Sequence, residues 1–129
     1  MIEPMTMFPV LVAEDLAALK AFYESSFGFR TVFFETDFYL HLMHPNSGVQ
    51  LGFLVPDHPP QPEFLHPKAS AEGMVISFEV ADIDAALTSA RSMGLDFAMN
   101  HKEEPWGQKH FMVRDPAGFI VDVIEHQNP

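Results

Sequence analysis

The 129-residue chain contains no cysteine, which excludes disulfide bonds, thiolate catalysis and thiolate metal sites. Basic residues are scarce as well, since seven Lys and Arg stand against eighteen Asp and Glu and give a formal net charge of −11. Nucleic acids and anionic membranes are bound through clustered basic residues, so neither is expected as a partner. A negative field favours a cationic ligand; the alternative is that the charge serves only solubility.

Long apolar runs are also missing, and none reaches the roughly 20 residues that a membrane-spanning helix needs. Residues 1–4 carry no basic segment ahead of an apolar run, so no signal peptide is expected and a cytoplasmic location is the default. No nucleophile elbow, phosphate loop or dinucleotide fingerprint occurs. Apolar residues, by contrast, make up 47% of the chain and include thirteen Phe, which predicts one domain with a substantial aromatic core or pocket.

The clearest pattern is an internal repeat. Residues 8–16 and 75–83 each read as an apolar strand that runs into an Asp and then a helical pattern. Asp15 and Asp82 are natural N-caps, because an Asp carboxylate accepts hydrogen bonds from the free N–H groups of a helix start. Gly28 and Gly94 are expected to end the two helices. A repeat of this length indicates one supersecondary unit used twice.

The predicted order is a strand, a helix and three strands, twice over, in an α+β fold. The strands are expected at about 5–12, 30–36, 38–44 and 48–55, then at about 74–81, 95–99, 109–114 and 118–125. Asp115-Pro116-Ala117-Gly118 predicts the hairpin turn between the last two strands. Residues 1–129 would form a single domain, with βαβββ repeats at about 5–55 and 74–126 joined by a Pro-rich connector, 56–73. Because a helix covers only one face of its own sheet, the curved mixed sheets are expected to share a cup.

This pattern resembles the vicinal oxygen chelate superfamily, which includes glyoxalase I, extradiol dioxygenases and the fosfomycin- and bleomycin-resistance proteins. The resemblance covers roughly residues 5–126 and implies the glyoxalase/bleomycin-resistance fold. Within the group the chain is most similar to the bleomycin-resistance proteins, through Pro9-Val10-Leu11, Phe22, Phe27-Gly28-Phe29, Asp37-Phe38, Pro105-Trp106-Gly107 and Arg114-Asp115-Pro116-Ala117-Gly118. It departs from the known drug binders in the strand from Val75 to Val80, which lacks their Trp residues.

The resemblance also implies where the superfamily's enzymes hold a divalent metal. The matching positions here are Phe8, Gln50 or Gly52, Val75 and Asp122. Phe and Val have no lone pair to donate, and catalytic metal sites normally need three protein ligands. We therefore expect no metal at the usual place and no cofactor, and whether the protein is an enzyme stays open, with the balance against it.

Trp106 and Phe38 are the leading candidates for ligand binding. In the bleomycin-resistance proteins the matching Trp and Phe stack on the flat part of the drug, and aromatic faces bind planar or cationic groups. The alternatives are that Trp106 plugs the cup and that Phe38 packs within the sheet.

Further candidates come from the strands. The walls of the expected cup would be formed by Phe8, Val10, Val75 and Ser77, which either line a cavity or fill it. A buried Asp122 needs a partner, which would be a cationic ligand group or the side chain of Arg114 or Lys109. His41, His110 and Glu79 could make a displaced metal or acid–base site, or be ordinary packing and surface residues.

Three hypotheses follow. The first is a metal-free protein that sequesters a small planar molecule, with a cationic molecule as one alternative. Its candidate binding residues are Trp106, Phe38, Phe8, Gln50, Val75 and Asp122. The second is a metal-dependent lyase, isomerase or dioxygenase with displaced ligands such as Gln50, Asp122, His41 and His110. The third is a non-catalytic structural or regulatory dimer whose cup is filled. In each case a second copy of the chain is expected as the partner. One form of this homodimer would exchange the N-terminal strands between the two copies, with Pro9 as the hinge.

Overall fold

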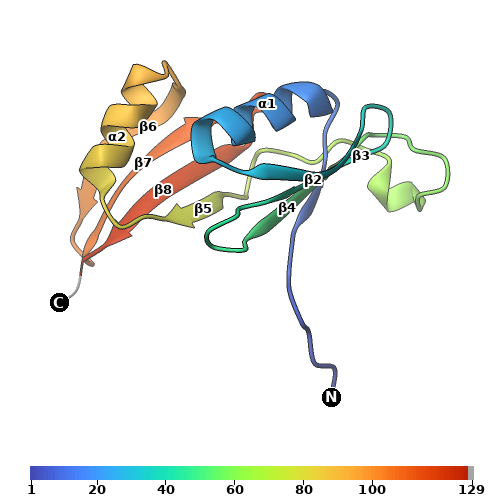
Figure 1. The fold of residues 1–129 in the computed structure, drawn as a ribbon, viewed down its shortest axis with the longest axis horizontal. Helices are drawn as coiled ribbons and strands as arrows, with labels where there is room; N and C mark the ends of the chain where they lie inside the picture. Colours follow the sequence, from blue (N-terminus) through green and yellow to red (C-terminus); the bar gives the residue numbers. More distant parts are fainter. Residues whose placement is uncertain (128–129) are drawn as a thin grey trace. The chain divides into compact units, whose positions relative to one another are not determined.

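The computed structural model describes residues 1–127, which form two compact units, one from Met1 to Ala69 and one from Ser70 onward (Figure 1). Unit 1 contains β1 (Val10–Val12), α1 (Leu16–Phe27), β2 (Arg30–Glu35), β3 (Tyr39–Met43), β4 (Gln50–Leu54) and the short 3₁₀ helix η1 (Glu63–Leu65). Unit 2 contains β5 (Ile76–Glu79), α2 (Ile83–Ser92), β6 (Asp96–Glu104), β7 (Gln108–Arg114) and β8 (Ile120–His126). The predicted α+β class and the repeated βαβββ order are confirmed.

Each unit is built on one four-stranded mixed sheet. The strand order is β1-β4-β3-β2 in unit 1 and β5-β8-β7-β6 in unit 2. In both sheets the first strand pairs in parallel with the last, and the other neighbours are antiparallel. The helix of each unit is the crossover that this parallel pairing requires.

Both helices begin and end as the repeat predicts. The carboxylates of Asp15 and Asp82 each accept a hydrogen bond from a backbone N–H three residues on, at 3.1 Å in both cases. Gly28 and Gly94 follow the two helices in the left-handed conformation, with φ of 72° and 66°, where glycine carries no steric cost. In residues 1–127 no helix is both long and apolar enough to cross a membrane.

Each helix packs on one face of its own sheet and leaves the other face uncovered. In unit 1 the apolar side of α1 (Leu16, Leu19, Tyr23) is buried with Leu40, Leu42, Leu51 and Phe53 of the sheet. In unit 2, Ile83, Leu87 and Ala90 of α2 are buried with Phe111, Val113, Val121 and Val123. Because side chains alternate along a strand, the residues between these core positions lie on the uncovered faces.

Three strand boundaries were wrong. β1 begins at Val10, not near residue 5, and Met5 and Met7 are almost fully exposed because the segment before Pro9 has no strand beside it. β5 is limited to Ile76–Glu79, although 74–81 was expected, since only these residues pair with β8. β6 continues to Glu104 instead of ending near residue 99, because two register irregularities let it stay paired with β7.

The turn from Asp115 to Gly118 is confirmed in detail. The Gly118 N–H donates to the Asp115 carbonyl oxygen at 2.9 Å, and the Asp115 carboxylate accepts from the N–H groups of Ala117 and Phe119. Asp115 is 5% exposed, so these hydrogen bonds satisfy a buried acid.

Candidate functional site

The uncovered face of unit 1 carries a chain of polar contacts between neighbouring strands. The Tyr39 hydroxyl lies 2.8 Å from His41 Nδ1, and His41 Nε2 lies 2.6 Å from Gln50 Oε1. The amide nitrogen of Gln50 in turn donates to Thr6 Oγ1 at 3.3 Å. An amide oxygen only accepts, so His41 Nε2 carries the hydrogen and, in the neutral ring, Nδ1 accepts the hydrogen of Tyr39. Burial raises the pKa of Tyr39, which keeps the phenol protonated as that donor.

Gly52 makes room for this arrangement. A Cβ at Gly52 would overlap the Tyr39 hydroxyl and lie 2.9 Å from its ring carbon Cζ. Any other residue at this point of β4 would therefore displace the Tyr39 side chain. The Phe8 ring meets the edge of the His41 ring, with centroids 4.7 Å apart, while remaining 40% exposed.

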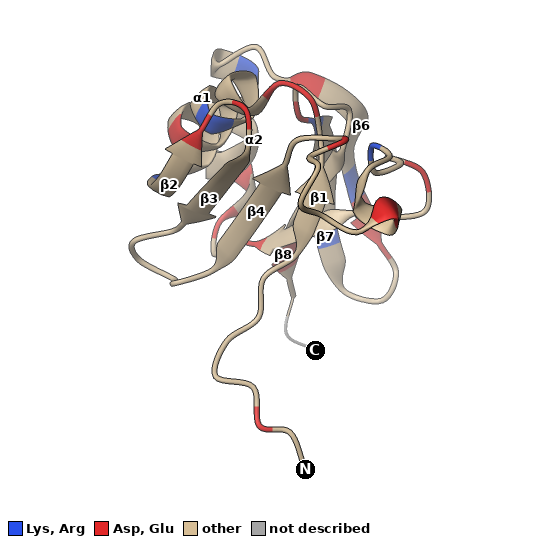
Figure 2. Cartoon of the chain, turned by 90° about the vertical axis from the view of Figure 1, so that its right-hand side faces the viewer, with Lys and Arg blue, Asp and Glu red and all other residues tan. Residues whose placement is uncertain are grey.

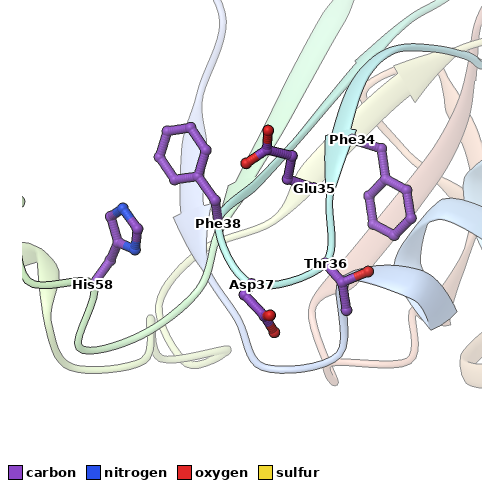
Figure 3. Close-up of a pocket in the computed structure, with 6 residues that line it drawn as sticks. All are labelled: Phe34, Glu35, Thr36, Asp37, Phe38 and His58. Carbon is purple, nitrogen blue, oxygen red and sulfur yellow. The ribbon is translucent and has the colours of Figure 1, made fainter.

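The end of this sheet where β2 turns into β3 holds a pocket of about 570 Å³ (Figure 3). It is lined by Phe34, Glu35, Thr36, Asp37, Phe38 and His58. The rings of Phe38 and His58 stack, with centroids 4.7 Å apart and an interplanar angle of 27°. This volume is typical of sites that bind small molecules.

The charge of the pocket is negative. Within residues 1–127, neither Glu35 nor Asp37 forms an ion pair, although eight such pairs involving other residues are present. Acidic residues lie along many segments of the chain and basic residues along few (Figure 2). Unpaired carboxylates beside stacked rings suit a ligand that is both flat and positively charged.

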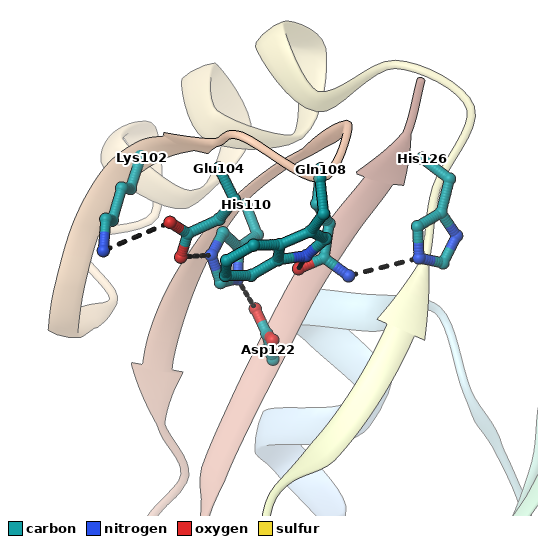
Figure 4. Close-up of polar contacts among 7 residues, drawn as sticks. Lys102, Glu104, Gln108, His110, Asp122 and His126 are labelled. Carbon is teal, nitrogen blue, oxygen red and sulfur yellow. Dashed lines mark hydrogen bonds and ion pairs between the residues drawn. The ribbon is translucent and has the colours of Figure 1, made fainter. Parts of the chain in front are cut away.

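The uncovered face of unit 2 holds a buried histidine between two carboxylates (Figure 4). His110 Nδ1 lies 2.8 Å from Asp122 Oδ1, and its Nε2 lies 3.0 Å from Glu104 Oε2. Lys102 Nζ lies 3.2 Å from the other oxygen of Glu104. The side chains of His110, Glu104 and Asp122 are only 6–9% exposed.

The carboxylates decide the charge of His110. Burial by itself lowers the pKa of His110, but the hydrogen bonds and charges of Glu104 and Asp122 outweigh it and raise the pKa above the ordinary value of 6.5. The hydrogen bond from His110 in turn holds the pKa of Glu104 below its ordinary value, with burial opposing and Lys102 assisting. Two ionised carboxylates facing both ring nitrogens require an imidazolium, because only that form has two N–H donors.

The prediction that Asp122 pairs with Arg114 or Lys109 was wrong. Its carboxylate pairs with His110, whereas Arg114 pairs with Asp96 at 3.4 Å and Lys109 approaches Glu103 at 4.0 Å. Strand alternation explains why Lys109 is not the partner, because it lies on the opposite face of β7 from Asp122. Arg114 shares the face of Asp122 and lies diagonal to it, as His110 does, but its guanidinium pairs with Asp96, its direct partner on β6.

Trp106 lies in the turn between β6 and β7 and is 68% exposed. Its Nε1 donates to Gln108 Oε1 at 3.3 Å, and Gln108 also contacts His126 (Figure 4). His126 in turn lies 3.2 Å from Glu79. Val75 lies just before β5 and is 46% exposed.

The positions at which the resemblance puts metal ligands do not fit a metal. Phe8 and Val75 offer no donor atom, the Gln50 oxygen accepts from His41, and Asp122 pairs with His110. Among residues 1–127, no group of three or more His, Asp and Glu is placed to hold a metal ion. His41 belongs to unit 1 and His110 to unit 2, and each already has a partner at both ring nitrogens.

The structure thus brings some of the predicted residues together within each unit. Phe8 and Gln50 meet at His41, Phe38 lines the pocket, and Asp122 belongs to the His110 cluster. Sequence reasoning missed Tyr39, His58 and Glu104. A signal existed for Tyr39, since it shares a strand face with His41 at a spacing of two.

Comparison with known proteins agrees with this fold. A family model described as the Glyoxalase/Bleomycin resistance protein/Dioxygenase superfamily matches residues 6–123. No curated protein matches the sequence.

Several solved structures resemble the chain over nearly its whole length. A glyoxalase/bleomycin resistance protein/dioxygenase from Nocardioides is 19% identical, with a TM-score of 0.77 over 99% of this chain and 87% of that one. A lactoylglutathione lyase from Agrobacterium tumefaciens is 25% identical, with a TM-score of 0.74 over 95% and 94%. TioX from Micromonospora sp. ML1 is 19% identical, with a TM-score of 0.75 over 95% and 99%.

Proposed function

The chain belongs to the Glyoxalase/Bleomycin resistance protein/Dioxygenase superfamily, and we propose that it is a metal-free binding protein that sequesters a planar, cationic small molecule. The observation that carries the proposal is the pocket at the β2–β3 turn, where the stacked Phe38 and His58 rings lie beside the carboxylates of Glu35 and Asp37. A flat cation would gain from both the ring faces and the negative charge.

Two further features support this function. Two candidate ligand-binding residues outside the pocket, the half-exposed Phe8 and the largely exposed Trp106, offer aromatic surface on which a planar ligand can stack. The proposal also keeps three candidate ligand-binding residues on the uncovered faces, namely Val75, Gln50 and Asp122. Sequestration requires affinity and abundance, and it needs no reaction.

The test is a titration with 9-aminoacridine, a flat cation, followed by its own fluorescence. We expect saturable binding by the wild type and an affinity at least tenfold lower for the double variant Glu35→Gln/Asp37→Asn, which corresponds to about 1.4 kcal/mol. The matched control is Glu72→Gln/Asp84→Asn, which removes the same charge from exposed positions in unit 2. An equal loss in both double variants would mean that the overall charge of the protein attracts the probe and that the pocket does not bind it.

A second candidate function, a divalent-metal-dependent lyase, isomerase or dioxygenase, is favoured by the likeness to a lactoylglutathione lyase. Thermal melting with and without Mn²⁺, Fe²⁺, Co²⁺, Ni²⁺ and Zn²⁺ after chelator treatment separates the two. A metal at 100 times its dissociation constant would add about 2.7 kcal/mol to the stability of the folded state. A clear rise in the melting temperature with one metal would support the enzyme and contradict the binding proposal. A protein that binds neither metal nor planar cations would fit a structural or regulatory dimer.

We also propose that the chain forms a homodimer in which the N-terminal segment contacts the second copy. Met1, Ile2, Met5 and Met7 are each at least 79% exposed, an unusual concentration of apolar side chains outside a core. Light scattering of the full chain and of a chain lacking residues 1–8 measures the contribution of the segment. Two monomeric species would contradict the dimer.

A further inference from the structure

The uncovered face of unit 1 holds the polar chain formed by Tyr39, His41 and Gln50, and of these three residues the binding proposal names only Gln50. From its geometry we infer that Tyr39, oriented by His41 and Gln50, accepts a hydrogen bond from an N–H group of the bound planar cation. This inference rests on the proposed function and narrows the ligand to cations that carry an N–H, such as protonated amino-heterocycles.

The direction of each hydrogen bond leads to this assignment. Gln50 Oε1 fixes the hydrogen of His41 on Nε2, and the neutral His41 ring then takes the Tyr39 hydrogen at Nδ1. The Tyr39 oxygen is left with lone pairs and no free hydrogen, so toward a ligand it acts as an acceptor. Donation to His41 also polarises the hydroxyl and strengthens it in that role.

The position of the hydroxyl is fixed by its surroundings. Gly52 provides the space beneath it, and the Phe8 ring packs perpendicular to the His41 ring at a centroid distance of 4.7 Å. A hydrogen-bonding group that is oriented before the ligand arrives costs less to use on binding.

Aromatic and acidic residues lie beside Tyr39 on the same face of the sheet. Phe33 pairs with His41 across the β2–β3 ladder and is 41% exposed, and its ring centroid lies 6.4 Å from that of Tyr39. Glu35 is the direct cross-strand partner of Tyr39 and also lines the pocket at the β2–β3 turn. Arg30 is the basic residue of this sheet, and it lies opposite Met43 at the far end of the ladder from Tyr39. The face next to Tyr39 is thus aromatic and negative, and the hydroxyl adds an acceptor to it.

The first experiment compares two flat cations of similar size, 9-aminoacridine, which carries N–H groups, and 10-methylacridinium, which has none. We expect the wild type to prefer 9-aminoacridine about tenfold and Tyr39→Phe to lose most of that preference while keeping its affinity for 10-methylacridinium. The control is Tyr23→Phe, which removes the other tyrosine hydroxyl of the chain from the buried core of unit 1. A preference that survives in Tyr39→Phe would overturn the inference and leave the binding function standing. Failure of the wild type to bind either cation would overturn both.

The second experiment tests the polar chain without a ligand. Two-bond ¹H–¹⁵N correlation spectra at mildly alkaline pH, where imidazoles are neutral, report which ring nitrogen carries the hydrogen. We expect the Nε2–H tautomer for His41, assigned by the signal that disappears in His41→Asn, and a change in that signal when Gln50→Met removes the acceptor. An Nδ1–H tautomer in the wild type would show that Tyr39 is not the donor, and the acceptor role would fail even if planar cations bind.

Discussion

Each unit places a histidine on the uncovered face of its sheet, and the two histidines have opposite surroundings. His41 and His110 both lie on the third strand of their unit, on the uncovered face, each in contact with a polar residue lying diagonally across on the fourth strand. In unit 1 the two ring nitrogens meet the neutral groups of Tyr39 and Gln50. In unit 2 they meet the carboxylates of Glu104 and Asp122.

The neighbours therefore decide what each histidine does. Neutral partners fix one tautomer of His41 and leave the Tyr39 oxygen to accept hydrogen bonds. Ionised partners hold His110 as a cation, which bridges two buried acids and ties β6, β7 and β8 together, while Lys102 supplies the second positive charge at Glu104. Gln50 and Asp122, the fourth-strand residues at two of the usual metal positions, have each become a histidine partner.

The largest expected effect is on unit 2. His110→Gln leaves the buried Asp122 without a cation and Glu104 with Lys102 alone, and removal of one partner from a buried ion pair typically costs about 3–5 kcal/mol. His41→Gln keeps a neutral polar group among neutral partners and should cost about 1 kcal/mol. Urea denaturation of both variants measures the contrast, and equal losses would contradict the difference in charge between the two sites.

The second effect concerns the space above Gly52. Gly52→Ala places a methyl group against the Tyr39 ring, and overpacking of this kind costs about 1–3 kcal/mol. The variant Gly52→Ala/Tyr39→Ala should be more stable than the sum of the single losses, because the smaller side chain removes the overlap. Additive losses in the urea denaturation of the three variants would show that Tyr39 is not the obstacle.

The contribution of each unit to ligand binding can be compared through one aromatic residue of each, the half-buried Phe38 in unit 1 and the exposed Trp106 in unit 2. Phe38→Ala should weaken 9-aminoacridine binding at least tenfold, or about 1.4 kcal/mol, because it removes a stacking surface from the pocket. Trp106→Ala tests separately whether the indole of unit 2 also binds the cation. Phe64→Ala, which removes an 80% exposed ring from η1, is the control. If affinity is unchanged in Trp106→Ala, unit 1 binds the cation without it.

The two helix starts share one capping hydrogen bond, and its loss should have a similar effect in both units, although α2 also has a hydrogen bond from the Ile83 N–H to Glu125. Asp15→Ala and Asp82→Ala each remove one capping hydrogen bond of 3.1 Å, and such a change costs about 1 kcal/mol. Asn at either position retains the acceptor and should restore most of the stability. If only one of the two Ala variants lost stability, the two caps would have the same geometry and different contributions to the free energy of unfolding.

The smallest effect is a pH dependence that comes from the His110 cluster of unit 2. Because the pKa of His110 is raised, its stabilising contribution is complete below the ordinary value of 6.5 and is lost as the pH rises through the raised pKa. Because the pKa of Glu104 is lowered, its contribution is complete above the ordinary value of 4.5 and is lost as the pH falls through the lowered pKa.

Both contributions are therefore complete between pH 4.5 and 6.5. The melting temperature of the wild type should fall above this range, and His110→Gln should flatten that fall. A fall of the same steepness in His110→Gln would mean that other groups cause it.

Local signals in the sequence were enough to predict the repeat and much of its detail. Asp15, Asp82 and the turn at Asp115 act through hydrogen bonds to residues within four positions, so the pattern alone contains them. The start of β1 and the end of β6 depend instead on which neighbouring strand offers a partner, and there the predicted boundaries were wrong.

The sequence by itself determined the βαβββ repeat, the family, the negative charge and the lack of donor atoms at Phe8 and Val75, because each follows from residue type or short-range spacing. Only the tertiary structure decided that Asp122 meets His110 instead of Arg114 or Lys109, that Tyr39 lies over Gly52, and that His58 stacks on Phe38. These contacts join residues whose side chains meet across strands or between a sheet and a connector. Strand register and the path of the connector set such distances, and neither is written in local spacing.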